Sequence, residues 1–536
     1  MKYVLTLLLM IGAAVAQAPT DDPVLQAMSA EMKRSQERLR LAQEKVPYYI
    51  EYSLSDQDAY QAEAAMGASR GEVRIRARMF RVFVRVGDRK MDNSMPWSPL
   101  PGAIELGVVD DDVLALRHSL WLATDKAYKN ALQQYSAKEA MKKQFESVTP
   151  IDDFAAASPT TDVRPLAKLE GVSLQWAPVL ERMTAPARRE ANVQEFSGNA
   201  RLSATNKYFV NSEGSVTRQG QTLFEVRVEG STQAADGMSL ELSKAHVWLT
   251  PAEVMSVDKL EAESKELITT LLQLRDAPVV DDQYRGPVLL STSAAGTVVS
   301  NLIGDNILGR RPRLGETARV RGAFANDLKA RVLPDTISVV DDPTATNNGG
   351  RLLAGAYTTD DEGVKAQRVT VIDKGVLVAY LLGRTPIKDF QQSNGHGRVG
   401  GYSVEPRISN LFLQSSQPTP EAELTKRFLE SCRQRELEYC YRVESLGRGN
   451  APRLLYRVRA KDGHEDLVRG STIGQMDLRS LRNDIVAVGD KMEVSNNGGS
   501  SPYAIIAPAL LFDELEIKKE NDTKEKLPNY PRPPVQ

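Results

Sequence analysis

The residue types that most often perform hydrolytic or metal chemistry are scarce in this chain of 536 residues. It has four histidines, and no two of them lie at the spacing of metal ligands. They are His118, His246, His396 and His464. A hydrolytic zinc site needs imidazole, thiolate or carboxylate ligands and one open position for water. The histidines therefore argue against a zinc centre built by this chain alone.

Two polar groupings in the C-terminal half have both a functional and a structural interpretation. Asp360, Asp361 and Glu362 precede Gly363, and their oxygens suit a hard cation, although acidic residues before a glycine also form ordinary turns. His396 lies in a glycine loop, whose backbone lets a ligand approach closely. A lone histidine, however, is usually exposed to solvent or bonded to backbone. The structural interpretation is favoured for both groupings.

The order of motifs between residues 349 and 413 resembles that of the TldD/PmbA family. In that family a D-x-x-G-x-x-x-Q-R segment is followed by a hairpin, by a small-residue loop with a basic residue and by an R-x-x-N strand. The same order occurs here in Asp360 to Arg368, in the turn Asp373 to Gly375, in the loop Ser393 to Arg398 and in Arg407 to Asn410. The resemblance makes His396, Arg398 and Asn410 candidates for substrate binding.

TldD-type members of this family resemble zinc peptidases with the motif H-E-x-x-x-H on a helix before this region. The corresponding apolar stretch is residues 286–309, in which Gly304 aligns with the glycine before the second histidine. The three motif positions are then Ser300, Asn301 and Asp305. A serine, an amide and one carboxylate do not make a hydrolytic zinc site, and Asn301 cannot act as a general base.

A family loop that can supply a further cysteine ligand corresponds to residues 494–502, where Ser495 occupies that position. No histidine lies between His246 and His396, so no other register restores the motif. The chain therefore resembles the PmbA, or TldE, type, which keeps the fold without the metal site. The resemblance implies no cofactor in this chain, and zinc only in a TldD-like partner.

Three hypotheses for function follow, and the chain's own status as an enzyme stays open among them. The first is a zinc-free subunit of a peptidase complex that acts on small unstructured peptides, paired with a TldD-like zinc-bearing subunit. The second is a stand-alone peptide-binding or scaffold protein of the periplasm, such as a self-dimer. The third is a peptidase with relocated ligands, for example Asp305 with His396.

Composition and charge are those of an ordinary globular protein. Hydrophobic residues make up 41% and charged residues 26%, which excludes large-scale disorder. The formal net charge is -2 and the sequence pI is about 6.3, so the charge of the chain gives no indication of a nucleic-acid partner. We therefore do not infer contact with DNA from the family's label as a modulator of DNA gyrase.

The first residues predict a secretory signal peptide. Lys2 precedes an apolar run over residues 4–15, and the small-x-small site Ala16-Gln17-Ala18 follows. We expect cleavage after Ala18, a periplasmic or secreted location, and no membrane span in the mature chain. Export permits a disulfide between Cys432 and Cys440, the only cysteines, and two buried thiols are the alternative.

Periodicity predicts an α+β chain in four parts. We expect the signal peptide at 1–18, an N-terminal α/β domain with a mixed sheet and long helices at 19–285, a C-terminal β-rich, barrel-like domain at 286–517, and a disordered tail at 518–536. Helices are expected at the following residues: 23–45, 110–145 (one helix or a pair), 176–183, 251–274, 297–308 and 421–434. A hairpin turn is expected at Asn211 to Gly214.

A row of arginines alternates with apolar residues and predicts a strand with one basic face. The row consists of Arg74, Arg76, Arg78, Arg81 and Arg85. A solvated face is the favoured interpretation, because such faces are common on antiparallel strands. A strip that binds anions or nucleic acid is the alternative.

Overall fold

The computed structural model describes residues 21–95, 102–143, 151–169, 175–280, 283–312, 316, 318–400, 403–447, 449, 451–474 and 476–520. The predicted signal peptide at 1–18 lies outside the described residues, as do residues 281–282 near the end of the expected N-terminal domain and residues 521–536 of the expected tail. The last described strand runs to Lys519, so the first residues of the expected tail are strand.

A seven-stranded mixed sheet forms the N-terminal part, in the order β3-β2-β1-β5-β6-β4, with β7 also paired to β6. Only β4 pairs in parallel. The strands are β1 (Pro47–Ala65), β2 (Ala68–Val86), β3 (Ala103–Gly107), β4 (Thr161–Val163), β5 (Val193–Asn211), β6 (Val216–Gln233) and β7 (Ser239–Trp248). The expected turn after Asn211 connects β5 to β6, and Gly214 there has φ +98°.

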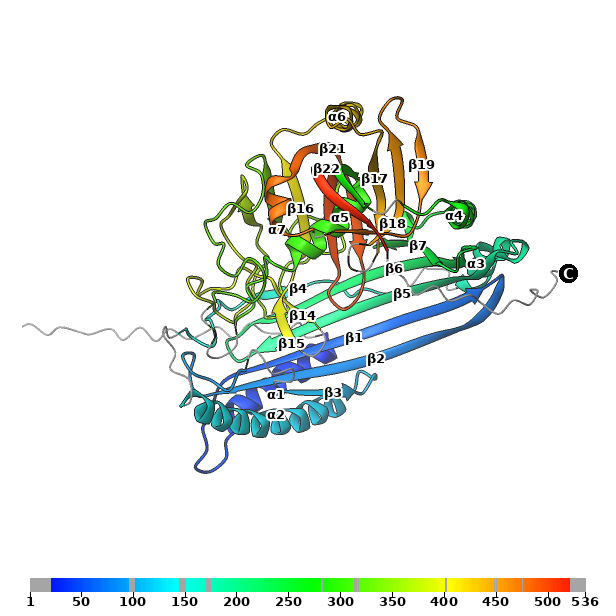
Figure 1. The fold of residues 1–536 in the computed structure, drawn as a ribbon. Helices are drawn as coiled ribbons and strands as arrows, with labels where there is room; N and C mark the ends of the chain where they lie inside the picture. Colours follow the sequence, from blue (N-terminus) through cyan, green and yellow to red (C-terminus); the bar gives the residue numbers. More distant parts are fainter. Residues whose placement is uncertain are drawn as a thin grey trace, which may run out of the picture.

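The two faces of this sheet have different neighbours because side chains alternate along each strand. Even-numbered residues such as Tyr52, Leu54, Phe80 and Val82 are buried against α1 (Pro23–Arg38) and α2 (Val113–Lys142). The C-terminal part of the chain lies over the opposite face (Figure 1). Odd-numbered residues of β1, β2, β5 and β6 therefore point toward the C-terminal part.

For the remaining helices, the number in the structure is closer to the number predicted from the sequence than their first and last residues are to the predicted ends. They are α3 (Trp176–Thr184), the 3₁₀ turns η1 (Ala185–Arg189) and η2 (Pro251–Glu253), α4 (Val257–Asp276), α5 (Thr292–Val298), the π-helical turn η3 (Val299–Gly304), α6 (Glu421–Gln434) and α7 (Leu478–Asn483). The stretch at 110–145 forms the single helix α2, with Asp112 as its N-cap. None of the helices described here is long and apolar enough to cross a membrane.

An eleven-stranded sheet forms the C-terminal part, in the order β13-β12-β9-β16-β22-β8-β17-β18-β19, with β20 and β21 paired to β22. Its strands are β8 (Gln283–Leu290), β9 (Ile337–Asp341), β12 (Val369–Asp373), β13 (Val376–Leu377), β16 (Asn410–Ser415), β17 (Tyr439–Leu446), β18 (Pro452–Arg459), β19 (Glu465–Val468), β20 (Ser471–Ile473), β21 (Ile485–Asn497) and β22 (Tyr503–Lys519). Two small ribbons accompany it: β10 (Asn347–Asn348) with β11 (Arg351–Leu352), and β14 (Gly397–Gly400) with β15 (Ser403–Pro406).

The α+β class is thus confirmed, whereas the barrel-like form is not. Among the described strands β13 and β19 are the two ends of the main path, and they do not pair with each other. Both are short, so neither edge presents enough backbone groups to close the sheet.

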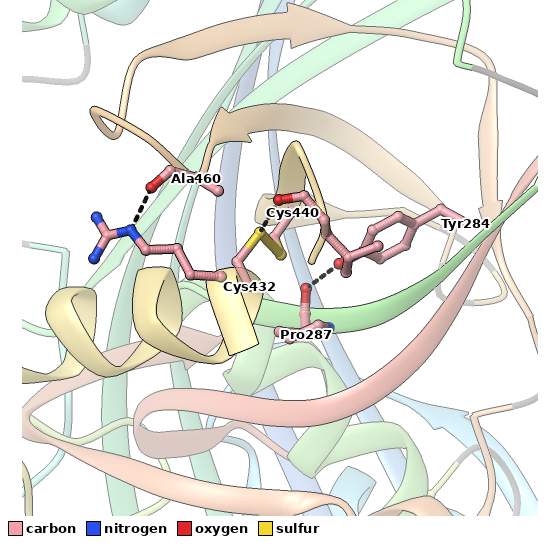
Figure 2. Close-up of a disulfide and its surroundings, with 7 residues drawn as sticks. Tyr284, Pro287, Cys432, Cys440 and Ala460 are labelled. Carbon is pink, nitrogen blue, oxygen red and sulfur yellow. Dashed lines mark hydrogen bonds between the residues drawn. A yellow bond between two sulfur atoms is a disulfide. The ribbon is translucent and has the colours of Figure 1, made fainter. Parts of the chain in front are cut away.

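A disulfide joins the end of α6 to β17 (Figure 2). Cys432 and Cys440 are fully buried, and their Cα atoms are 6.0 Å apart. The chain reverses between them at Glu436, which has φ +56°. Next to the bridge, Arg433 donates a hydrogen bond to the Ala460 carbonyl.

A buried polar network joins the two parts of the chain. Arg384, from the C-terminal part, is fully buried and donates to the Ala155 carbonyl at 2.7 Å and to the Tyr49 hydroxyl at 3.2 Å. Its guanidinium also lies 2.8 Å from Glu213 and 4.0 Å from the centre of the Phe154 ring. Because these partners all belong to the N-terminal part, the two sheets are held in a fixed relation.

Candidate functional site

The positions that match the family's zinc motif lie where α5 changes into a π-helical turn. The helix begins earlier than expected, because the Ser291 side chain caps it by accepting from the Ala294 amide. Asn301 and Asp305 are exposed and Ser300 is half-buried. Hydrogen bonds of a π-helix join residues five apart, so Ser300 and Asp305 lie on adjoining turns of nearly the same side. Five residues of a regular α-helix would instead turn through about 500°.

These residues do not fit a hydrolytic zinc ion. The helix offers one carboxylate with a hydroxyl and an amide, and Ser495, exposed on β21, adds only another hydroxyl. Within the described ranges, no three histidine, cysteine or acidic side chains come together as a metal site would require.

His396 and Asn410 are both fully buried. Nε2 of His396 lies 3.1 Å from Asp341 Oδ1, and its Nδ1 lies 3.0 Å from the carbonyl and side-chain oxygens of Asn394. Asn410 accepts from the Gly355 amide at 3.0 Å and donates to two carbonyls, so it fastens the loop that follows β9. The ring of His396 does not contact Asp305, and the relocated ligand pair is not brought together.

The acidic cluster is engaged by the protein itself. Both carboxylate oxygens of Asp360 accept backbone amides, and Glu362 accepts the Arg384 amide at 2.6 Å. Burial, together with repulsion by Glu362, raises the pKa of Asp360 well above its usual value, and burial also raises the pKa of Glu362. A β-carbon at Gly397 would lie 2.2 Å from Glu362, which explains the glycine there. The cluster is a structural turn rather than an open cation site.

A cavity of about 710 Å³ lies between the odd-numbered face of the first sheet and loops of the C-terminal part. Its floor includes a set of uncharged polar side chains beside charged and apolar ones: Ser53, Ser55, Gln57, Ser203, Thr205, Thr217, Gln219 and Gln221. Its roof comes from loops after β9, after β11, around β14 and after β21, with Tyr357, Asp361, Arg398 and Ser500 among its residues. Gln219 and Gln221 also donate to the Thr359 and Ala354 carbonyls, which holds roof to floor.

One end of the cavity is strongly charged. Lys207 from β5 lies 3.1 Å from Asp361, and Arg398 lies 3.3 Å from the same carboxylate. Burial alone would raise the pKa of Asp361, but these cations and the Val399 amide hold that pKa well below its usual value. Burial lowers the pKa of Lys207, and Asp361 opposes this effect. Of the three predicted substrate-binding residues, Arg398 alone lines the cavity.

Comparison with known proteins decides the family. A family model described as the PmbA/TldA metallopeptidase C-terminal domain matches residues 283–519, which contain the whole second sheet. The chain belongs to the TldD/PmbA family.

Curated TldD/PmbA relatives match over part of their length. A metalloprotease of Archaeoglobus fulgidus is 25% identical over 263 residues, which are 49% of this chain and 55% of the relative. A metalloprotease TldD homolog of Buchnera aphidicola is 26% identical over 163 residues, which are 30% of this chain and 31% of the relative. This chain thus spans about half or less of these two relatives.

Solved structures share the TldD/PmbA fold along nearly the whole chain. A protein of Thermotoga maritima described as a modulator of a DNA gyrase has a TM-score of 0.62 at 16% identity, covering 92% of this chain and 99% of the other. TldE from Thermococcus kodakarensis has a TM-score of 0.59 at 12% identity, with the same coverage of both chains. These likenesses concern the fold.

Sequence reasoning missed most of the cavity. The available signal was the polar residue at every second position of β1, β5 and β6. On strands whose other face is buried, such alternation indicates that the polar face meets solvent or another polar surface. The letters GASRG at residues 67–71 also match the G-x-S-x-G pattern of serine hydrolases. Here Gly67 belongs to the turn after β1 and the other four residues begin β2, whereas a nucleophile elbow leads from a strand into a helix.

Proposed function

We propose that this chain is the zinc-free, PmbA-like subunit of an exported peptidase complex that acts on small, flexible peptides. The observation that carries the proposal is the content of the motif helix. Ser300, Asn301 and Asp305 occupy a π-helical turn suited to a five-residue ligand spacing, yet none of them is an imidazole, and the position of the catalytic glutamate is taken by the amide of Asn301. In this proposal a TldD-like subunit supplies the zinc and this chain supplies part of the substrate enclosure.

Two further observations support the proposal. The fold likeness to TldE extends over 92% of this chain. The floor of the cavity is formed by strands and carries uncharged polar side chains, and extended peptides bind readily to surfaces that offer hydrogen bonds at strand spacing. Export is supported by the N-terminal sequence and agrees with a buried disulfide.

The test is reconstitution with a zinc-bearing, TldD-like protein from the same source. We expect the isolated chain, beginning after Ala18, to bind no zinc and to leave casein uncut. The co-purified complex should contain zinc by elemental analysis and should cut unstructured peptides, and replacement of the partner's motif glutamate by glutamine should abolish cutting. Stoichiometric zinc and chelator-sensitive cleavage in the isolated chain would contradict the proposal.

The second candidate is a stand-alone peptide-binding or scaffold protein of the periplasm, such as a self-dimer. It is favoured by the fact that residues of a single chain form the whole described cavity. In that case the isolated chain binds peptides and no metal-bearing protein co-elutes with it in gel filtration. Co-elution at a fixed stoichiometry would exclude this candidate.

A further inference from the structure

Arg81 differs from the other arginines in its row on β2. Arg74, Arg76, Arg78 and Arg85 each lie within 3.2 Å of a carboxylate. Within the described part of the chain, no carboxylate lies within ion-pair distance of Arg81. The predicted single basic face is wrong, because Arg74, Arg76 and Arg78 lie on the even-numbered side of β2 and Arg81 and Arg85 on the odd-numbered side. Arg81 is the member whose buried charge has no counter-ion among the described residues.

Arg81 is also poorly supplied with hydrogen bonds. Its side chain lines the cavity although the residue is only 6% exposed. One Nη atom donates to the Ser53 hydroxyl at 3.2 Å, whereas Nε and the other Nη have no partner among the described residues. A buried guanidinium normally has its five N–H groups satisfied by acceptors. The missing acceptors point to a ligand.

The neighbouring charges leave this end of the cavity positive. Arg81, Lys207 and Arg398 lie around a single carboxylate, Asp361, which already pairs with two of the three cations. The other acidic residues of the lining cannot compensate: Asp360 is bound by backbone amides, and Glu225 lies toward the other end of β6. Arg201, at that other end, has no ion pair among the described residues, but it is exposed to water.

We propose that this end of the cavity binds the terminal carboxylate of an extended peptide, with Arg81 as the residue that holds it and Lys207 beside it. Guanidinium groups recognise carboxylates through paired N–H donors. In the strand register, Arg81 is level with Phe209 of β5, and Glu225 is level with Arg201 of the same strand. The stretch of β5 from Phe209 to Arg201, and hence the sheet between the two ends, is about 27 Å long at roughly 3.4 Å per residue. The peptide as bearer of the carboxylate rests on the proposed function, whereas the carboxylate chemistry rests on the cavity alone.

The experiment compares three fluorescein-labelled six-residue peptides by anisotropy with the full chain. One ends in a free carboxylate, one in an amide, and one in an amide preceded by glutamate. We expect the free acid to bind about tenfold or more tightly than both amides, because it alone places a carboxylate at Arg81. Arg81→Gln should reduce this ratio to about one. Arg227→Gln, which removes the same charge from β6 outside the cavity, should leave the ratio unchanged.

Equal binding of the free acid and the plain amide by the wild-type chain would overturn the carboxylate site, and this comparison needs no variant. That result would leave the reconstitution of a peptidase complex unaffected, so the two proposals can fail separately. Binding of the glutamate amide as tightly as the free acid would assign the site to side-chain carboxylates and overturn the terminal one. A ratio that survives in a folded Arg81→Gln protein would overturn the role of Arg81.

Discussion

At the scale of single residues, burial separates structural groups from binding groups more sharply than residue type does. His396 and Asn410 belong to the family motifs, but both are enclosed and fully bonded within the C-terminal part. Arg398 and Arg81 reach the cavity, and two nitrogens of Arg81 have no hydrogen-bond partner in the described part of the chain. A motif position is thus a stronger indication of the fold than of contact with a ligand.

His396→Ala should lower the free energy of unfolding by about 2–4 kcal/mol, because it leaves a cavity and removes a hydrogen-bond partner of buried Asp341. Urea unfolding measures this loss, and anisotropy should show unchanged peptide affinity. Normal stability with weakened binding would instead place His396 in the binding site.

Glu362→Gln should stabilise the chain more at pH 8 than at pH 4. Burial raises the pKa of Glu362 in the folded chain, so its favourable contribution is present below the unfolded pKa of about 4.3 and is lost as the pH rises through the folded pKa. The amide oxygen of glutamine can still accept the Arg384 N–H. Urea unfolding at both pH values gives the difference, and an effect independent of pH would contradict the assignment.

At the scale of elements, two features show that the local backbone conformation decides which side chains come together. The π-helical turn after α5 brings positions five apart toward one side, which a regular helix does not do. The disulfide fixes the reversal between α6 and β17. In both cases the sequence spacing of two residues shows whether their side chains meet only when the local backbone conformation is known.

The double variant Ser300→His/Asp305→His should bind zinc, because the π-helical turn presents both imidazoles to one ion. Thr425→His/Glu430→His has the same spacing on the regular helix α6 and should not bind it. Titration calorimetry with zinc distinguishes the two. Equal binding by both pairs would show that the π geometry is not responsible.

Replacing both Cys432 and Cys440 by alanine should lower the free energy of unfolding by about 2–3 kcal/mol, since the bridge closes a short loop of the unfolded chain. Reductant should destabilise the wild-type chain by a similar amount and leave the double variant unaffected. The bridge would be contradicted if thiol titration found free cysteines in the wild-type chain and reductant left its stability unchanged.

At the scale of the whole molecule, the cavity exists because the two parts of the chain are fixed against each other. The first sheet supplies its floor, loops of the second part supply its roof, and α1 and α2 cover the opposite face of the floor (Figure 1). Arg384 connects the two parts through contacts with Tyr49, Phe154 and Glu213.

Arg384→Met should therefore lower the free energy of unfolding by about 3 kcal/mol or more, because a buried ion pair loses one partner and the two parts lose their shared contact. Arg331→Met, at an exposed position, should change it by about 0.5 kcal/mol or less. Calorimetry on both variants checks this. Equal small effects would show that the network does not join the parts.

The sequence by itself determined the α+β class, helices such as α6, the turn at Asn211 to Gly214 and the lack of histidine in the motif stretch at 286–309, because these depend on local periodicity and residue identity. Tertiary structure decided which residues meet. Strand register placed Arg81 and Lys207 on the same face, and folding brought Asp361 and Arg398 over them. Burial and charge pairing depend on partners far apart in the chain, so a single strand pattern could not distinguish Arg81 from its paired neighbours.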